Sequence, residues 1–130
     1  MDTNLIETAV RGRCAKRRDV VAVYLHGSRA RGTARASSDL DVAVLYTETP
    51  PPGLAALSLP LEAELEQDLG VPVQVLTLNT APPDVAHRVL RDGVLLLERD
   101  ASARVAFEIR ARNEYFDVKP YLDEYRRPAS

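Results

Sequence analysis

The chain has 130 residues, of which 45% are apolar, and it carries a formal net charge of −2 at neutral pH. This length and apolar share suit an ordinary core, so we expect one domain over residues 1–130. The small net charge excludes a broad positive field, and tight non-specific binding to nucleic acid is not expected. No run of about 18 apolar residues and no secretory leader is present, and Cys14 is the only cysteine, so we expect a cytoplasmic protein with no membrane partner.

Strands and helices alternate in the hydrophobic pattern. It predicts, in chain order, a helix over 3–18, strands over 20–26 and 39–46, a helix over 54–69, a strand over 71–78, a short helix ending near Gly93, a strand over 94–98, and a C-terminal helical segment over 101–127 that Pro120 interrupts. The connection over 27–38 is too short and too polar for a helical crossover between parallel strands. We therefore expect an α/β or α+β fold with a small mixed or antiparallel sheet of about four strands and helices packed on one face.

The connection between the first two predicted strands begins with Gly27 and Ser28, and ten residues separate Ser28 from Asp39. A glycine at the end of a buried strand lets the backbone approach a ligand closely, and Ser28 adds a hydroxyl and a backbone donor. Side chains at i and i+2 of a strand share a face, so Asp39 and Asp41 are expected to point the same way. Because adjacent carboxylates repel unless a cation lies between them, the pair predicts an Mg²⁺ site that also takes triphosphate oxygens.

Arginines in the same connection suit a triphosphate, because Arg29, Arg31 and Arg35 each offer a guanidinium to phosphate oxygens. Ser38 is expected to cap or orient the start of the aspartate strand. A Gly-Ser pair alone is common, and Asp-x-Asp alone often marks a solvated strand edge. Together, between two β-branched strands, they indicate nucleotidyl transfer, in which metal ions hold the attacking and leaving oxygens.

The segment HGSRARGTARASSDLD resembles the signature of the minimal nucleotidyltransferases (MNT) of the polymerase β-like superfamily, which is Gly-Ser, ten residues and Asp-x-Asp. The resemblance extends to VPVQVLTLN and, less specifically, to FEIRARNEYFDVKPYLDEY. It implies a polymerase β palm-like fold that holds ATP between the Gly-Ser loop and the aspartate strand. The candidate nucleotide-binding residues are then Gly27, Ser28, Arg29, Arg31 and Ser38.

Members of this superfamily generally carry a third carboxylate on a later strand, and the matching position here is Gln74, within VPVQVLTLN. A glutamine carbonyl can ligate a metal, but it cannot accept a proton at neutral pH. The candidate catalytic residues are therefore Asp39, Asp41 and Gln74. Two interpretations stay open: the site binds ATP and metal without turnover, or it works with a reduced carboxylate set.

The resemblance also implies a partner, because MNT proteins commonly pair with a HEPN-domain ribonuclease toxin, and some transfer AMP from ATP to a tyrosine of that toxin. The leading hypothesis is an MNT antitoxin of this kind, with Mg²⁺ as cofactor. An alternative is a catalytically impaired binding module that neutralises the toxin by occlusion. A transferase acting on a small hydroxyl compound is less favoured, since there is no second domain to build an acceptor pocket.

Other polar side chains receive ordinary interpretations. His26 is expected to end its strand at the pocket wall, with no carboxylate placed to orient it, and His87 is expected at the surface. The glutamates Glu62, Glu64 and Glu66 are expected to form a solvated helix face.

Four aromatic residues gather near the C-terminus of a chain otherwise poor in aromatics: Tyr115, Phe116, Tyr121 and Tyr125. We expect some of them to pack the last helix on the sheet and the rest to suit a homo- or hetero-oligomeric contact. Glu108 precedes Arg112 by four residues, which is the spacing of a helical ion pair.

Overall fold

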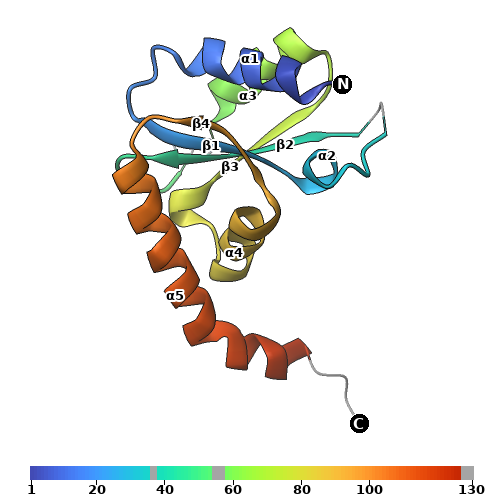
Figure 1. Ribbon diagram of the computed structural model, residues 1–130. Helices are drawn as coiled ribbons and strands as arrows, with labels where there is room; N and C mark the ends of the chain where they lie inside the picture. Colours follow the sequence, from blue (N-terminus) through green and yellow to red (C-terminus); the bar gives the residue numbers. More distant parts are fainter. Residues whose placement is uncertain (36–37, 54–57, 127–130) are drawn as a thin grey trace.

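The fold is known from a computed structural model, which describes residues 1–35, 38–53 and 58–126. Its elements are α1 (Thr3–Cys14), β1 (Val20–His26), α2 (Gly27–Arg31), β2 (Leu40–Tyr46), α3 (Leu59–Leu69), β3 (Val73–Thr77), the 3₁₀ helix η2 (Leu78–Thr80), α4 (Pro83–Asp92), β4 (Val94–Glu98) and α5 (Ala101–Arg126) (Figure 1). The predicted helical residues at 54–57 and at 127 lie outside the described residues.

The four strands form one sheet in the order β3-β2-β1-β4. β1 runs antiparallel to β2 and to β4, whereas β2 and β3 are parallel. The short connection after β1 reverses the chain, while α3 provides the crossover that a parallel pair needs. The mixed sheet of four strands is therefore confirmed.

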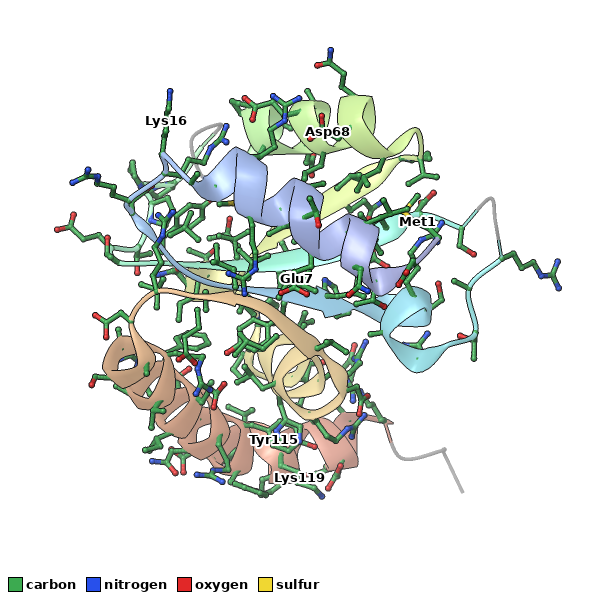
Figure 2. All side chains as sticks on the ribbon, turned by 45° about the horizontal axis from the view of Figure 1, so that its top comes forward. Met1, Glu7, Lys16, Asp68, Tyr115 and Lys119 are labelled. Carbon is green, nitrogen blue, oxygen red and sulfur yellow. The ribbon has the colours of Figure 1, made fainter. Side chains whose placement is uncertain are left out.

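Helices cover both faces of this sheet, so the expectation that they pack on one face is wrong. Ile6 and Val10 of α1 pack with Leu65 of α3 on one face, and Val89 of α4 packs with Phe107 of α5 on the other. Figures 1 and 2 show these two helical layers on opposite sides of the strands. The physical reason is that β1 and β2 are apolar on both sides, which requires a cover on each.

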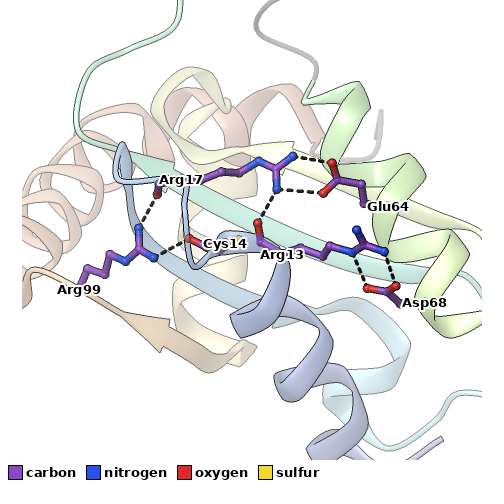
Figure 3. Close-up of polar contacts among 6 residues, drawn as sticks. All are labelled: Arg13, Cys14, Arg17, Glu64, Asp68 and Arg99. Atoms are coloured by element: carbon purple, nitrogen blue, oxygen red, sulfur yellow. Dashed lines mark hydrogen bonds and ion pairs between the residues drawn. The ribbon is translucent and has the colours of Figure 1, made fainter.

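Ion pairs join the two helices of the first layer. Arg13 of α1 meets Asp68 of α3 at 2.6 Å, and Arg17, just beyond α1, meets Glu64 at 3.0 Å (Figure 3). Both arginines donate two hydrogen bonds to the facing carboxylate, a geometry that fixes direction as well as distance. The pairs therefore set how α3 lies against α1.

The first helix ends at Cys14, four residues earlier than predicted. Carbonyl groups at a helix end lack partners within the helix. Here the Arg99 guanidinium donates to the carbonyl oxygen of Cys14 at 2.5 Å (Figure 3). It also donates to the carbonyl oxygen of Ala15 at 3.0 Å. A side chain from after β4 thus satisfies the end of α1, and Cys14 itself is buried.

The outer edge of β3 is capped by two glutamates of α3. Glu62 accepts a hydrogen bond from the backbone N–H of Val75 at 2.8 Å, and Glu66 accepts one from Val73 at 3.0 Å. Both N–H groups point away from β2 and would otherwise be unpaired at the edge. With Glu64 bound to Arg17, the prediction of a merely solvated glutamate face is wrong for all three residues.

The last helix continues through Pro120, although the sequence predicted that this proline interrupts it. Proline cannot donate to the carbonyl of Phe116 four residues earlier. Since Pro120 and Phe116 are both exposed, solvent can hydrate that carbonyl and the helix persists. Among the described helices, none is both long enough and apolar enough to cross a bilayer.

A polar network anchors α5 to the sheet. Glu108 accepts a hydrogen bond from the hydroxyl of the buried Tyr24 at 2.7 Å, and it forms an ion pair with Arg104 at 2.7 Å. Its partner is therefore Arg104, and not Arg112 as the sequence spacing indicated. Burial and the Glu108 carboxylate raise the pKa of Tyr24, so this hydroxyl remains a donor.

Candidate functional site

Three polar side chains stand in a row across the end of the sheet. His26 of β1 is paired with Asp41 of β2, and Asp41 is paired with Gln74 of β3. Paired residues share a face of the sheet. The preceding row of Leu25 and Val42 enters the core beneath α1 and α3, so the polar row faces the opposite layer, that of α4 and α5.

Sequence reasoning found two members of this row and missed the third. Asp41 follows from strand phase, and Gln74 follows from the resemblance. His26 was expected to have no orienting carboxylate, but the β1–β2 register places Asp41 directly across from it. Antiparallel register is a long-range property, which explains why local spacing did not indicate this neighbour.

The backbone of Gly27 approaches the Asp41 carboxylate closely. Gly27 has a φ of +73°, and a Cβ atom at this position would lie 2.3 Å from Oδ2 of Asp41. A residue with a side chain would therefore be strained in its backbone and would collide with the carboxylate. Glycine is required here because the loop and the aspartate strand meet.

Beside this contact lies a cavity of about 240 Å³ between the sheet end and α4. Its lining residues are His26, Gly27, Arg31, Asp41, Val85, Arg88, Val89 and Asp92. The cations Arg31 and Arg88 border the same space as Asp41, which suits a ligand that carries phosphate oxygens. Sequence reasoning missed the α4 members, although their i, i+3, i+4, i+7 spacing marks one helix face.

The imidazole of His26 has an unusual environment. Its Nε2 atom is buried and has no hydrogen-bond partner among the described residues. Burial lowers the pKa of His26, while the Asp41 carboxylate and a hydrogen bond with the Val42 backbone act in the opposite direction. The ring is thus neutral at neutral pH.

The loop after α2 is held by its own side chains. Arg29 donates from Nη2 to the Ser38 carbonyl oxygen at 2.6 Å. The Ser38 hydroxyl in turn accepts a hydrogen bond from the backbone of Arg35 at 2.8 Å, so Ser38 orders the approach to β2. Arg29 therefore has a structural contact that the sequence did not predict. Arg31, the last residue of α2, lines the cavity beside Asp41.

The start of α2 and the approach to β2 hold the remaining predicted residues. Gly27 and Ser28 begin α2, whose first N–H groups have no partner within the helix. Asp39 is exposed and lies one residue before β2, although the sequence predicted it within the strand. Its side chain is therefore less constrained than that of Asp41.

The candidate metal ligands are side-chain oxygen atoms, which suit a hard cation that takes most of its ligands from water and substrate. No group of three His, Cys, Asp or Glu residues within the described part of the chain could hold a metal ion. Asp39, Asp41 and the Gln74 amide oxygen would provide few protein ligands, and Mg²⁺ would tolerate this because it keeps waters and binds substrate phosphates. The cavity beside Asp41, bordered by Arg31 and Arg88, offers space for such phosphate oxygens.

Residues 10–102 match the family model described as polymerase beta, nucleotidyltransferase. The chain belongs to this family. A solved structure described as a "putative minimal nucleotidyltransferase" is 35% identical, with a TM-score of 0.58 over 72% of this chain and 95% of that one. A Methanocaldococcus jannaschii protein with the name "Putative protein adenylyltransferase" is 38% identical over 74 residues, which cover 56% of this chain and 75% of that protein.

Solved toxin–antitoxin structures match more of this chain. A chain of a toxin–antitoxin complex with AMP-PNP has a TM-score of 0.71 at 21% identity, over 96% of this chain and 98% of that one. A chain of the complex between the tri-AMPylated HEPN toxin of Shewanella oneidensis and an MNT antitoxin has a TM-score of 0.70 at 18% identity, over 95% and 98%. These likenesses establish a shared fold that includes α5.

Proposed function

We propose that this nucleotidyltransferase is the antitoxin of a HEPN toxin and transfers AMP from ATP to a tyrosine of that toxin. The observation that carries the proposal is the contact of the Gly27 backbone with the Asp41 carboxylate, beside a cavity with Arg31 and Arg88. The name of the M. jannaschii relative and the toxin complexes with the same fold support it.

Each residue of the candidate site has a separate role in this proposal. Asp39 and Asp41 would hold Mg²⁺, which supplies charge neutralisation for the triphosphate. The amides of Gly27 and Ser28, with Arg31, would receive the phosphate oxygens. The hydrogen bond from Arg29 to the Ser38 carbonyl oxygen would hold the loop in the conformation that presents these amides and Arg31 to the phosphates.

In the reaction, the tyrosine oxygen forms a bond to the α-phosphorus of ATP as the bond to the β-phosphate oxygen breaks. Pyrophosphate leaves, and the tyrosine proton passes to solvent, because Gln74 cannot accept it. Loss of one general base typically costs about 10²–10⁴-fold in rate, so slow transfer is expected.

A second function is favoured by the same glutamine. Gln74 stands in register with Asp41 where the family resemblance implies a third carboxylate. The chain would then bind ATP and metal without turnover, and it would neutralise its partner by covering it.

Labelled ATP separates the two functions. The purified chain is incubated with Mg²⁺, ATP and the product of the neighbouring gene, which the proposal expects to be a HEPN toxin. Under AMP transfer, label appears on the partner, and it disappears with Asp39→Ala or Asp41→Ala. The matched control is Asp19→Ala, an exposed aspartate just before the other end of β1, which should leave labelling unchanged. A tight complex without label would support occlusion instead.

Gln74→Asp tests the third position directly. The register places the new carboxylate beside Asp41, so we expect any weak transfer to rise, by up to about 10²-fold. Single-turnover rates with the wild type as control measure the change. An unchanged rate, with ATP binding intact, would show that position 74 does not take part.

A further inference from the structure

His26 and Asp41 are neighbours across β1 and β2, on the face of the sheet that α4 and α5 cover (Figure 1). Directly paired residues of antiparallel strands have Cβ atoms about 4.5–5.5 Å apart. The Asp41 carboxylate lies against the backbone that follows His26, since a Cβ atom on Gly27 would be 2.3 Å from its Oδ2 atom. Both side chains also line the cavity beside α4. An imidazole and a carboxylate therefore border one small space at the end of β1.

The imidazole presents a lone pair at this place. The ring forms a hydrogen bond with the Val42 backbone, and because this bond raises the pKa of His26, the ring is its donor. Nε2 has no hydrogen-bond partner among the described residues, so the donating atom is Nδ1. A neutral imidazole carries one proton, and with that proton on Nδ1 the Nε2 atom is an acceptor.

Nε2 and the Asp41 carboxylate cannot pair with each other, because both are acceptors. Buried polar atoms in folded proteins are nearly always paired, so this nitrogen requires a partner. Arg31 and Arg88 border the same cavity, yet neither donates to Nε2. A cation can satisfy both acceptors, since carboxylate oxygens and neutral imidazole nitrogens are metal ligands. The geometry points to His26 as a protein ligand, through Nε2, of the cation that Asp41 would hold.

A nitrogen ligand changes which cation the site prefers. The oxygen atoms of Asp39, Asp41 and Gln74 suit Mg²⁺, whereas imidazole suits transition metals. Mn²⁺ is a first-row transition metal that also favours carboxylate and water oxygens, so it accepts this mixed set. We therefore expect the site to hold Mn²⁺ more tightly than Mg²⁺. His26 and Asp41 would supply two of its ligands, and water and phosphates would supply most of the others.

This inference rests on the proposed function, which places a cation at the aspartate strand. Gln74, on the β3 side of Asp41, offers a neutral oxygen where the family resemblance implies a carboxylate. His26 lies on the β1 side of the same aspartate. It would restore the number of strong protein ligands without restoring the negative charge.

Pulsed electron paramagnetic resonance of bound Mn²⁺ tests the ligand without any turnover. The full chain is loaded with Mn²⁺, with and without a non-hydrolysable ATP analogue. A directly bound imidazole gives a nitrogen coupling. This coupling should change when the chain is made with histidine that carries a heavy nitrogen isotope, and that change separates it from adenine nitrogens.

Leucine variants of the two histidines assign the coupling. His26→Leu should lose it, and His87→Leu, the matched control, should keep it. His87 lies outside the cavity lining and stacks on Tyr115 with the ring centroids 3.7 Å apart, which corrects the expectation of a surface His87. Mn²⁺ binding should weaken by about tenfold or more in His26→Leu. Mg²⁺ binding, measured by calorimetry, should change by less than about threefold. Circular dichroism checks that both variants fold.

The outcomes separate this inference from the proposed function. If the coupling of the wild type does not depend on labelled histidine, or persists in His26→Leu, the ligand is wrong while AMP transfer can still stand. A histidine coupling in a chain that never transfers AMP would uphold the ligand and reject the transfer. A chain that binds no Mn²⁺ would overturn the inference.

Discussion

Gly27 and Asp41 lie fourteen positions apart in the sequence. Even so, the Asp41 carboxylate lies so close to the Gly27 backbone that a side chain at position 27 would collide with it. Strand phase predicted the direction of Asp41, and the turn predicted a glycine at 27. Their mutual contact depends on how the loop folds back over β2, and local spacing does not encode that. The same limit explains why His26 and Arg88 were missed as neighbours of Asp41.

Gly27→Ala should destabilise the protein by at least about 1 kcal/mol, since its φ of +73° is left-handed, and it should abolish ATP binding by displacing the Asp41 carboxylate. Chemical denaturation and titration with ATP measure the two effects. Gly12→Ala is the control: it lies within α1 with open space around it, and it should gain about 0.5–1 kcal/mol. ATP binding that survives Gly27→Ala would contradict the assigned approach of loop and strand.

The buried imidazole predicts a pH dependence. The folded pKa of His26 lies below its ordinary value of 6.5, so the unfolded chain takes up the proton first as the pH falls. Its contribution to stability is therefore complete above about pH 6.5 and is lost as the pH falls toward the folded pKa.

His26→Gln should remove this part of the pH dependence. Between about pH 7.5 and about pH 5 the wild type should lose more stability than the variant, as urea midpoints at successive pH values would show. The carboxylates of Asp68 and Asp84, whose pKa values are lowered by Arg13 and Arg126, contribute equally to both chains. Parallel curves for the two chains would mean that His26 is not buried as a neutral ring.

At the scale of elements, the strands were predicted more closely than the helices. β1 and β4 have the predicted bounds, because their apolar runs end at glycine or at charged residues. α1 ends early because Arg99, which is distant in sequence, takes its last carbonyls. α5 passes through Pro120 because exposure lets solvent replace the lost hydrogen bond. A tertiary contact therefore determines where α1 ends, and solvent exposure lets α5 continue through its proline.

The capped edge of β3 gives an element-scale prediction. Glu62→Ala removes the acceptor for the Val75 N–H and should cost about 1 kcal/mol in the free energy of unfolding. It should also promote self-association, since an edge N–H becomes available to another strand. Denaturation and light scattering measure both. Glu62→Gln keeps an acceptor oxygen and should lose less; equal losses for the two variants would rule out the capping role.

For the whole molecule, the sequence predicted the mixed sheet and the position of the aspartate strand, but it placed the helices on one face. The run VVAVYL was informative on this point, because a strand that is apolar at every position must be covered on both sides. The second layer matters for the candidate site, since α4 closes the cavity beside Asp41.

The position of the label in ATP tests the central claim most directly. The chain, Mg²⁺ and the product of the neighbouring gene are incubated in parallel with ATP labelled at the α-phosphate and at the γ-phosphate. Nucleotidyl transfer at Asp41 predicts label on the partner from the α-position and none from the γ-position. Label from the γ-position, or none from either while ATP is bound, would contradict it.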